Sequence, residues 1–101
     1  MKKVTILDEL IEIIKKKKNN PTKNSYTTFL FQQGKEKIAN KFGEEAFELT
    51  TACLTQDKKE IIHETADLIY HLFVLLEESK VSPEEVWDLL QQRMKDEKNG
   101  K

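Results

Sequence analysis

Residues 57–79, DKKEIIHETADLIYHLFVLLEES, decide the fold of this chain. Apolar side chains recur along the segment at helical spacing and cover more than half of the circumference of a helix. They are Ile61, Ile62, Ala66, Leu68, Ile69, Leu72, Phe73, Leu75 and Leu76. A helix with so wide an apolar arc is covered by neighbours on several sides. We therefore predict an all-α protein with this segment as its central helix, opened by the capping pair Asp57 and Glu60.

Four further helices are predicted from their start and stop signals. They are expected at about residues 5–17, 25–34 and 35–54, and from residue 82 onward. Thr5 and Ser82 are strong capping residues, because each has an acidic residue three positions later. Pro83 follows Ser82 at the first helical position, where its missing N–H costs nothing. The last residues, 96–101, are expected to fray, since chain ends are poorly held.

Two of these helices carry narrower apolar stripes. The stripe of the third helix is Ile38, Phe42, Ala46, Leu49 and Cys53, and that of the fifth is Val86, Leu89, Leu90 and Met94. Cys53 is the only cysteine, so no internal disulfide is possible, and its place on a stripe predicts a buried, inert thiol. Both stripes are expected to contribute to one core.

Size and composition narrow the classes of protein. The 101 residues suit a single domain over 1–101, and 38% hydrophobic and 35% charged residues with only three Gly fit a bundle of about five helices. A net charge of −1 lacks the basic field of a nucleic-acid-binding protein. No stretch approaches the roughly 20 apolar residues of a membrane span, and Asp8 and Glu9 interrupt the only leader-like segment. We expect a soluble, cytoplasmic protein.

Two acidic clusters stand on helices that must lie against each other. Glu44, Glu45 and Glu48 belong to the third helix, and Glu64 and Asp67 to the fourth. Residues three and four apart share a helix face, so the carboxylates are expected to converge. Gathered carboxylates repel one another, and a divalent cation relieves that repulsion. All-oxygen ligands suit Mg²⁺ or Mn²⁺ and not zinc.

Other interpretations of the acidic residues stay open or are set aside. The plain alternative is a solvated face with lysine partners, such as Lys41 four positions before Glu45. His63-Glu64-x-x-Asp67 lacks the second histidine of a zinc protease motif. A di-iron bundle needs two Glu-x-x-His pairs, and the sequence has only Glu60-x-x-His63.

Three other residues near the acids invite a functional reading. His71 follows Asp67 by four positions in an apolar run. It is either a partly buried histidine bonded to Asp67, a group that orients Asp67, or a contact to a substrate phosphate. Lys37 and Lys41 lie on the helix that carries the first acidic cluster, where a phosphate clamp would belong.

Four segments resemble a known enzyme family. They are LDELIEIIKKKK (7–18), NSYTTFLFQQG (24–34), KIANKFGEEAFEL (37–49) and ETADLIYHLFVLL (64–76). In this order the segments resemble phosphoribosyl-ATP pyrophosphatase, within the wider MazG-like all-α nucleotide pyrophosphatases with their E-E-x-x-E and E-x-x-D motifs. One departure is Phe29, which stands where many relatives have a basic residue.

The resemblance implies a reaction, a metal and a homodimer. The reaction is hydrolysis of phosphoribosyl-ATP to phosphoribosyl-AMP and pyrophosphate, the second step of histidine biosynthesis. The resemblance implies that the five acidic residues hold Mg²⁺, which neutralises the triphosphate and activates a water, with Glu45 and Glu48 as catalytic carboxylates. The substrate contacts that it implies are Ser25, Tyr26, Thr27, Lys37, Lys41 and His71.

Two other functions compete with this one. A house-cleaning NTP or dNTP pyrophosphatase would share the metal site and differ in its substrate pocket. A helical binding or scaffold module would use none of the acids, and Mg²⁺ would then not change its stability.

Overall fold

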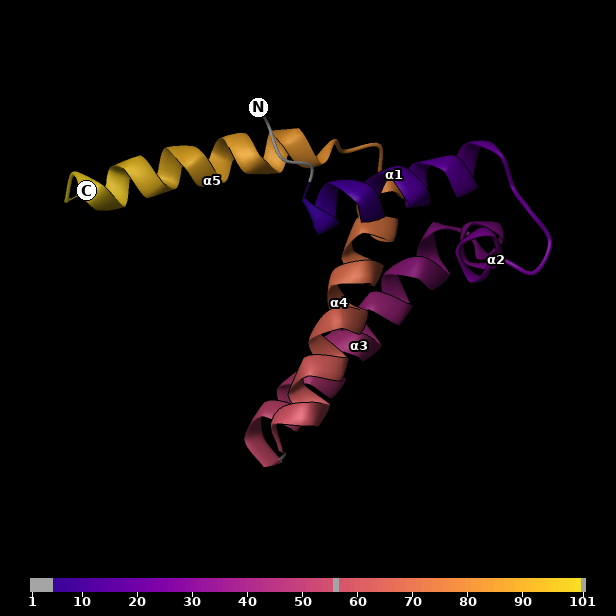
Figure 1. Ribbon diagram of the computed structural model, residues 1–101, viewed down its shortest axis with the longest axis horizontal. Helices are drawn as coiled ribbons and strands as arrows, with labels where there is room; N and C mark the ends of the chain where they lie inside the picture. Colours follow the sequence, from indigo (N-terminus) through magenta and orange to yellow (C-terminus); the bar gives the residue numbers. More distant parts are fainter. Residues whose placement is uncertain (1–4, 56, 101) are drawn as a thin grey trace.

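The computed structural model describes residues 5–55 and 57–100, and every regular element among them is a helix (Figure 1). The helices are α1 (Ile6–Asn19), α2 (Tyr26–Gln33), α3 (Lys35–Thr55), α4 (Lys58–Glu78) and α5 (Pro83–Lys98). The predicted all-α class and the five helices are confirmed.

The predicted caps begin the helices as expected. Thr5 and Ser82 each form a reciprocal capping box with the acidic residue three positions on. Ser25 accepts a hydrogen bond from the Thr28 N–H, and Asp57 accepts one from the Glu60 N–H. These bonds satisfy N–H groups that have no partner within their own helix. Fraying over residues 96–101 stays a prediction: α5 continues to Lys98, and Lys101 lies outside the described residues.

The core forms where α4 meets three other helices. α4 lies beside α3 along most of its length and also contacts α1 and α2 (Figure 1). The buried apolar residues at this junction are Ile14, Leu30, Ile38, Phe73 and Val74. Each fully buried aliphatic or aromatic side chain contributes about 1.5–3 kcal/mol through its removal from water. The predicted central position of residues 57–79 is confirmed.

The outer end of the α3–α4 pair is less buried than the sequence suggests. Cys53 is exposed, so the prediction of a buried thiol is wrong, and Ile62 is 60% exposed. The buried positions of α3 are Ile38, Glu45 and Ala52, seven residues apart. This heptad spacing describes a narrow seam between α3 and its neighbour α4 (Figure 1), so the rest of the predicted apolar stripe is not fully covered.

The fifth helix projects from the body of the molecule (Figure 1). None of its residues is buried, and Leu89, Leu90 and Met94 are all large exposed apolar side chains. The prediction that the apolar stripe of α5 contributes to the core is therefore wrong for a single chain. Near the start of α5, Trp87 packs against the core, and its ring meets Phe73 edge-on with 6.2 Å between centroids. The Cα radius of gyration is 15.7 Å, against about 13 Å for a compact chain of this length.

Candidate metal centre

The α3–α4 pair brings three carboxylates together. Glu45, Glu48 and Glu64 each offer an oxygen, and these atoms lie within 4.8 Å of one another. Glu45 and Glu48 are three residues apart on α3, so they share one face, and Glu64 reaches them from the neighbouring α4. Convergence of acids from the two motifs, expected from the spacing, is therefore present in the fold.

A second group of ligands adjoins the first. His63, Glu64 and Asp67 also offer atoms within 4.8 Å of one another, so Glu64 belongs to both groups. His63 Nε2 lies 3.4 Å from Asp67 Oδ2, and both side chains are reached by solvent. The two groups together make a continuous acidic surface across α3 and α4.

Two oxygens in this centre are buried without a hydrogen bond. Glu45 is only 5% exposed, and its Oε1 has no hydrogen-bond partner within residues 5–55 and 57–100. Glu64 is half-buried, and its Oε1 atom is likewise buried with no partner in that part of the chain. The other oxygen of Glu45, Oε2, lies 3.3 Å from Lys41 Nζ. A buried polar atom left without a partner costs about 1–3 kcal/mol, and more when it is charged. An oxygen-preferring cation fits this donor set, since it would satisfy both atoms at once.

Electrostatic effects in the centre agree with the crowding of negative charge. Burial, and then the neighbouring Glu48, Asp67 and Glu45 carboxylates, raise the pKa of Glu64, while His63 lowers it. The hydrogen bond to Glu45 raises the pKa of Lys41, so Lys41 is held as a cation beside the acids.

Glu44 and Lys37 take different positions from the other predicted site residues. Glu44 is exposed and belongs to neither group of ligands. It lines a shallow hollow together with Lys37, Asn40 and Lys41, next to the carboxylates. The helix spacing explains this: Glu44 lies about 100° from Glu45 around α3, so it cannot share the seam with α4.

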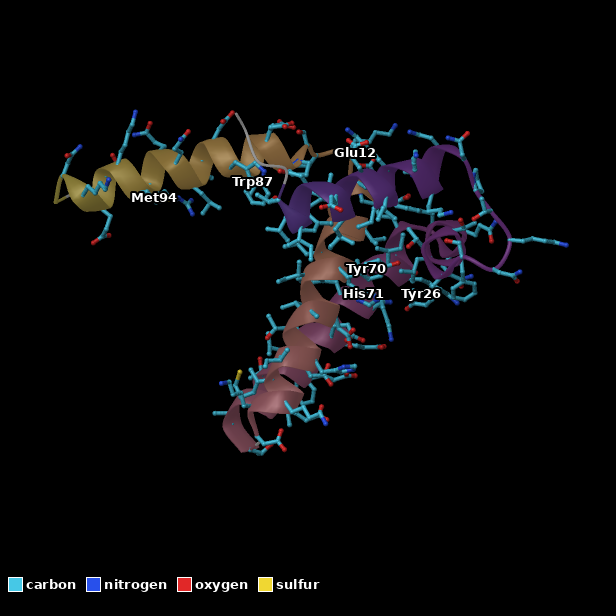
Figure 2. The ribbon with its side chains drawn as sticks, in the orientation of Figure 1. Glu12, Tyr26, Tyr70, His71, Trp87 and Met94 are labelled. Atoms are coloured by element: carbon cyan, nitrogen blue, oxygen red, sulfur yellow. The ribbon has the colours of Figure 1, made fainter. Side chains whose placement is uncertain are left out.

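His71 is buried beside two tyrosines. Its Nδ1 lies 2.7 Å from the main-chain oxygen of Asp67, and its Nε2 lies 3.4 Å from the Tyr26 hydroxyl. Because a carbonyl only accepts, Nδ1 carries a proton, and a neutral ring then accepts at Nε2 from Tyr26. The predicted bond to Asp67 is therefore made to the backbone and does not orient the Asp67 carboxylate. Figure 2 shows Tyr26, from α2, beside Tyr70 and His71, from α4.

The hydroxyls of Ser25 and Thr27 are already used within the fold. The Ser25 hydroxyl caps α2, and the Thr27 hydroxyl is buried and hydrogen-bonded to the hydroxyl of Tyr70. Tyr26, in contrast, is 49% exposed and remains accessible. The role of Tyr70 in holding α2 against α4 was missed from the sequence, because an aromatic residue within an apolar run gives no sign of a hydroxyl partner 43 residues away.

None of the helices formed by residues 5–55 and 57–100 is long and apolar enough to cross a membrane.

The fold and the centre define an all-helical protein whose two longest helices carry a carboxylate cluster suited to a divalent cation. Within that class the chain belongs to the phosphoribosyl-ATP pyrophosphohydrolase family, whose model matches residues 7–94.

Several curated relatives are similar over most of the chain. A phosphoribosyl-ATP pyrophosphatase of Sulfurisphaera tokodaii is 47% identical over 90 residues, covering 89% of this chain and 96% of that protein. The phosphoribosyl-ATP pyrophosphatase of Streptococcus thermophilus is 45% identical over 94 residues, covering 93% and 90%. A histidine biosynthesis bifunctional protein HisIE of Pyrococcus furiosus is 49% identical over 92 residues. The match covers 91% of this chain but 43% of that protein, so the chain spans less than half of this relative.

Proposed function

We propose that this chain hydrolyses phosphoribosyl-ATP to phosphoribosyl-AMP and pyrophosphate, the second step of histidine biosynthesis. Membership of the family and the names of the full-length relatives support the reaction. The observation that carries the proposal is the pair of buried, unpartnered oxygens of Glu45 and Glu64. Such oxygens are expected where a cation-bound polyphosphate is to be held.

The proposed metal is Mg²⁺, with Mn²⁺ as an alternative. Glu45, Glu48, Glu64 and Asp67 would hold it, since their oxygens lie in the two adjoining groups. When bound, a divalent cation neutralises polyphosphate charge and lowers the pKa of a coordinated water. Glu44, which stands outside both groups, would act on the cation from a greater distance.

The chain's own residues have distinct proposed roles. Lys41 pairs with Glu45 and stands at the edge of the carboxylates, where it and the exposed Lys37 would steady phosphate oxygens. Glu48 is the exposed carboxylate of its group, so it would accept the proton of the attacking water. Glu45 would hold its position through Lys41. Water would thus cleave the α–β phosphoanhydride and release pyrophosphate.

The test is pyrophosphate release with Mg²⁺ from phosphoribosyl-ATP, measured beside ATP, dUTP and dCTP. Turnover of phosphoribosyl-ATP alone would support the proposal. Turnover of the simple nucleotides instead would place the protein among house-cleaning pyrophosphatases that use the same metal centre. No turnover of any of the four by folded protein would favour a scaffold.

We further propose that the chain acts as a homodimer in the cytoplasm. The large apolar side chains left exposed on one chain support an interface, among them Phe47, Leu54 and Ile62 on the α3–α4 pair. Sedimentation equilibrium should give twice the 11.8 kDa chain mass. A single-chain mass at micromolar concentration would contradict the dimer. The free, exposed thiol of Cys53 suits a reducing compartment.

A further inference from the structure

Two aromatic rings on α2 form an exposed surface that the proposed chemistry has not used. Tyr26 and Phe29 are 49% and 51% exposed, although both are large apolar side chains. Their ring centroids are 6.2 Å apart and their planes differ by 25°, so the rings are nearly parallel. We call this pair the aromatic ledge. It borders an open hollow of about 700 Å³.

The aromatic ledge lies next to the metal centre. The Tyr26 hydroxyl is 3.4 Å from His71 Nε2. His71 Nδ1 in turn lies 2.7 Å from the main-chain oxygen of Asp67, a residue of the metal centre. From the metal centre outward the order is therefore Asp67, His71, Tyr26 and Phe29.

That order matches the order of groups in a nucleotide. A polyphosphate held at the carboxylates leaves the ribose and then the base to extend away from them, past His71 and toward Tyr26. Nucleobases stack on aromatic side chains, because every base offers a flat π-face. The hollow beside the aromatic ledge supplies two side-chain amides, Asn24 and Gln32. Among the residues that the structure describes, Lys23 is the only charged one that lines it, so the hollow does not repel an anionic ligand.

We propose that Phe29 is a specificity-determining residue, which forms with Tyr26 the surface on which the adenine base of the substrate stacks. This inference rests on the function proposed above and adds the part of the site that distinguishes a nucleotide from a simpler phosphate.

The test compares two ligands that differ only in the base. AMP and ribose 5-phosphate are titrated calorimetrically against the unaltered protein, Phe29→Ala, Phe29→Tyr and Gln33→Ala. The unaltered protein should bind AMP more tightly than ribose 5-phosphate. Phe29→Ala should weaken AMP binding about five- to tenfold, the lower part of the range for one base–aromatic stack, because Phe29 is half-exposed. Binding of ribose 5-phosphate should not change.

The other two variants are controls for the ring and for the helix. Phe29→Tyr keeps an aromatic face and should keep AMP affinity within about twofold of the unaltered protein. Gln33 is an exposed residue of α2 that does not line the hollow, so Gln33→Ala should leave both ligands unaffected. Circular dichroism should show the same helix content in all variants.

Enzyme kinetics provide an independent readout. With phosphoribosyl-ATP, Phe29→Ala should raise KM five- to tenfold and leave kcat within about twofold, because stacking binds the ground state and the transition state alike. Equal affinity of the unaltered protein for AMP and ribose 5-phosphate would overturn the inference. So would equal weakening of both ligands in Phe29→Ala, or dissociation of a dimer by this variant in sedimentation.

Failure of the inference and failure of the proposed function give different results. If the unaltered protein releases no pyrophosphate from phosphoribosyl-ATP, the proposed reaction is wrong whatever AMP does. If it does release pyrophosphate and Phe29→Ala behaves as the unaltered protein in binding and KM, only the stacking surface is wrong.

Discussion

Glu45 is the residue on which the metal centre depends most. Its side chain combines three properties that rarely meet on an exposed helix: it is 5% exposed, one oxygen is paired with Lys41, and the other has no hydrogen-bond partner in the part of the chain that the structure describes. A carboxylate kept so deep is costly unless it is compensated. Lys41 pairs with one oxygen of the Glu45 carboxylate, and a bound cation would be the partner of the other oxygen.

Substitution of Glu45 by Gln should remove activity while keeping the fold. The amide has the size of the carboxylate but lacks the charge that holds a cation, so we expect pyrophosphate release to fall by at least about 100-fold. Mg²⁺ should no longer raise the melting temperature of the variant. Glu97→Gln, an exposed change on α5, should retain both properties. Full activity in Glu45→Gln would show that the centre lies elsewhere.

Glu64 should make stability depend on pH when no metal is present. Its pKa is raised above 4.5 in the folded protein, chiefly by burial and then by Glu48, so the folded state holds this proton more tightly than the unfolded state. The contribution of the protonated Glu64 to the free energy of unfolding is therefore fully present below pH 4.5, and it is lost as pH rises through the raised pKa.

Glu64→Gln has no proton to lose at this position, so its stability should not fall with Glu64 ionisation as pH rises. In metal chelator, the variant should unfold at a higher temperature than the unaltered protein at pH 7 and should approach it near pH 4. Thermal melts followed by circular dichroism between pH 4 and 8 measure the difference. An unaltered protein that instead gains stability relative to Glu64→Gln as pH rises would contradict the raised pKa.

At the scale of elements, the α3–α4 pair builds the centre, because it sets which carboxylates face each other. The heptad spacing of Ile38, Glu45 and Ala52 places Glu45 on the seam, among residues that would otherwise be apolar. α4, which begins at Lys58 directly after its capping residue Asp57, supplies Glu64 and Asp67. The register between the two helices thus determines the metal centre more than any loop does.

The cap of α4 should affect stability and not chemistry. Asp57 accepts the Glu60 N–H at 3.0 Å, two helical turns before Glu64. Asp57→Ala should lower the free energy of unfolding by about 1 kcal/mol. Asp57→Asn should keep most of the stability that the cap provides, since Asn caps as well as Asp. Urea unfolding measures the loss, and kcat should stay within about twofold. A kcat lowered equally by both variants would mean that Asp57 takes part in the reaction.

At the scale of the whole molecule, one junction holds four helices while the fifth stands apart. Ile14 of α1, Leu30 of α2 and Ile38 of α3 meet Phe73 and Val74 of α4 in this junction. The salt bridge from Lys18 Nζ to Glu78 Oε1, 2.8 Å long, ties α1 to the end of α4. The site is therefore carried on a supported pair of helices, whereas α5 contributes little to the fold of a single chain.

Truncation of a buried side chain at the junction should destabilise the fold far more than truncation of its exposed neighbour in the sequence. Ile14 is 1% exposed and Ile13 is 53% exposed. Ile14→Ala should cost about 2–5 kcal/mol, the usual range for a cavity in a core, and Ile14→Val about 0.5–1.5 kcal/mol. Ile13→Ala should stay near 0.5 kcal/mol. Urea unfolding of the three variants tests the order, and a similar cost for Ile13→Ala and Ile14→Ala would refute it.

The sequence by itself determined the five helices, their caps and the gathering of acids on α3 and α4. These features depend on neighbours three or four residues apart, which helical periodicity reports directly. Only the tertiary structure decided that one oxygen of Glu45 and one of Glu64 are buried with no hydrogen-bond partner among the described residues, and that Glu44 stands outside the cluster. It also decided that His71 bonds a backbone oxygen and that Cys53, Leu89, Leu90 and Met94 are exposed. The physical reason is that periodicity gives the face of a helix on which a residue lies, but the partner that covers that face comes from residues far away in the chain.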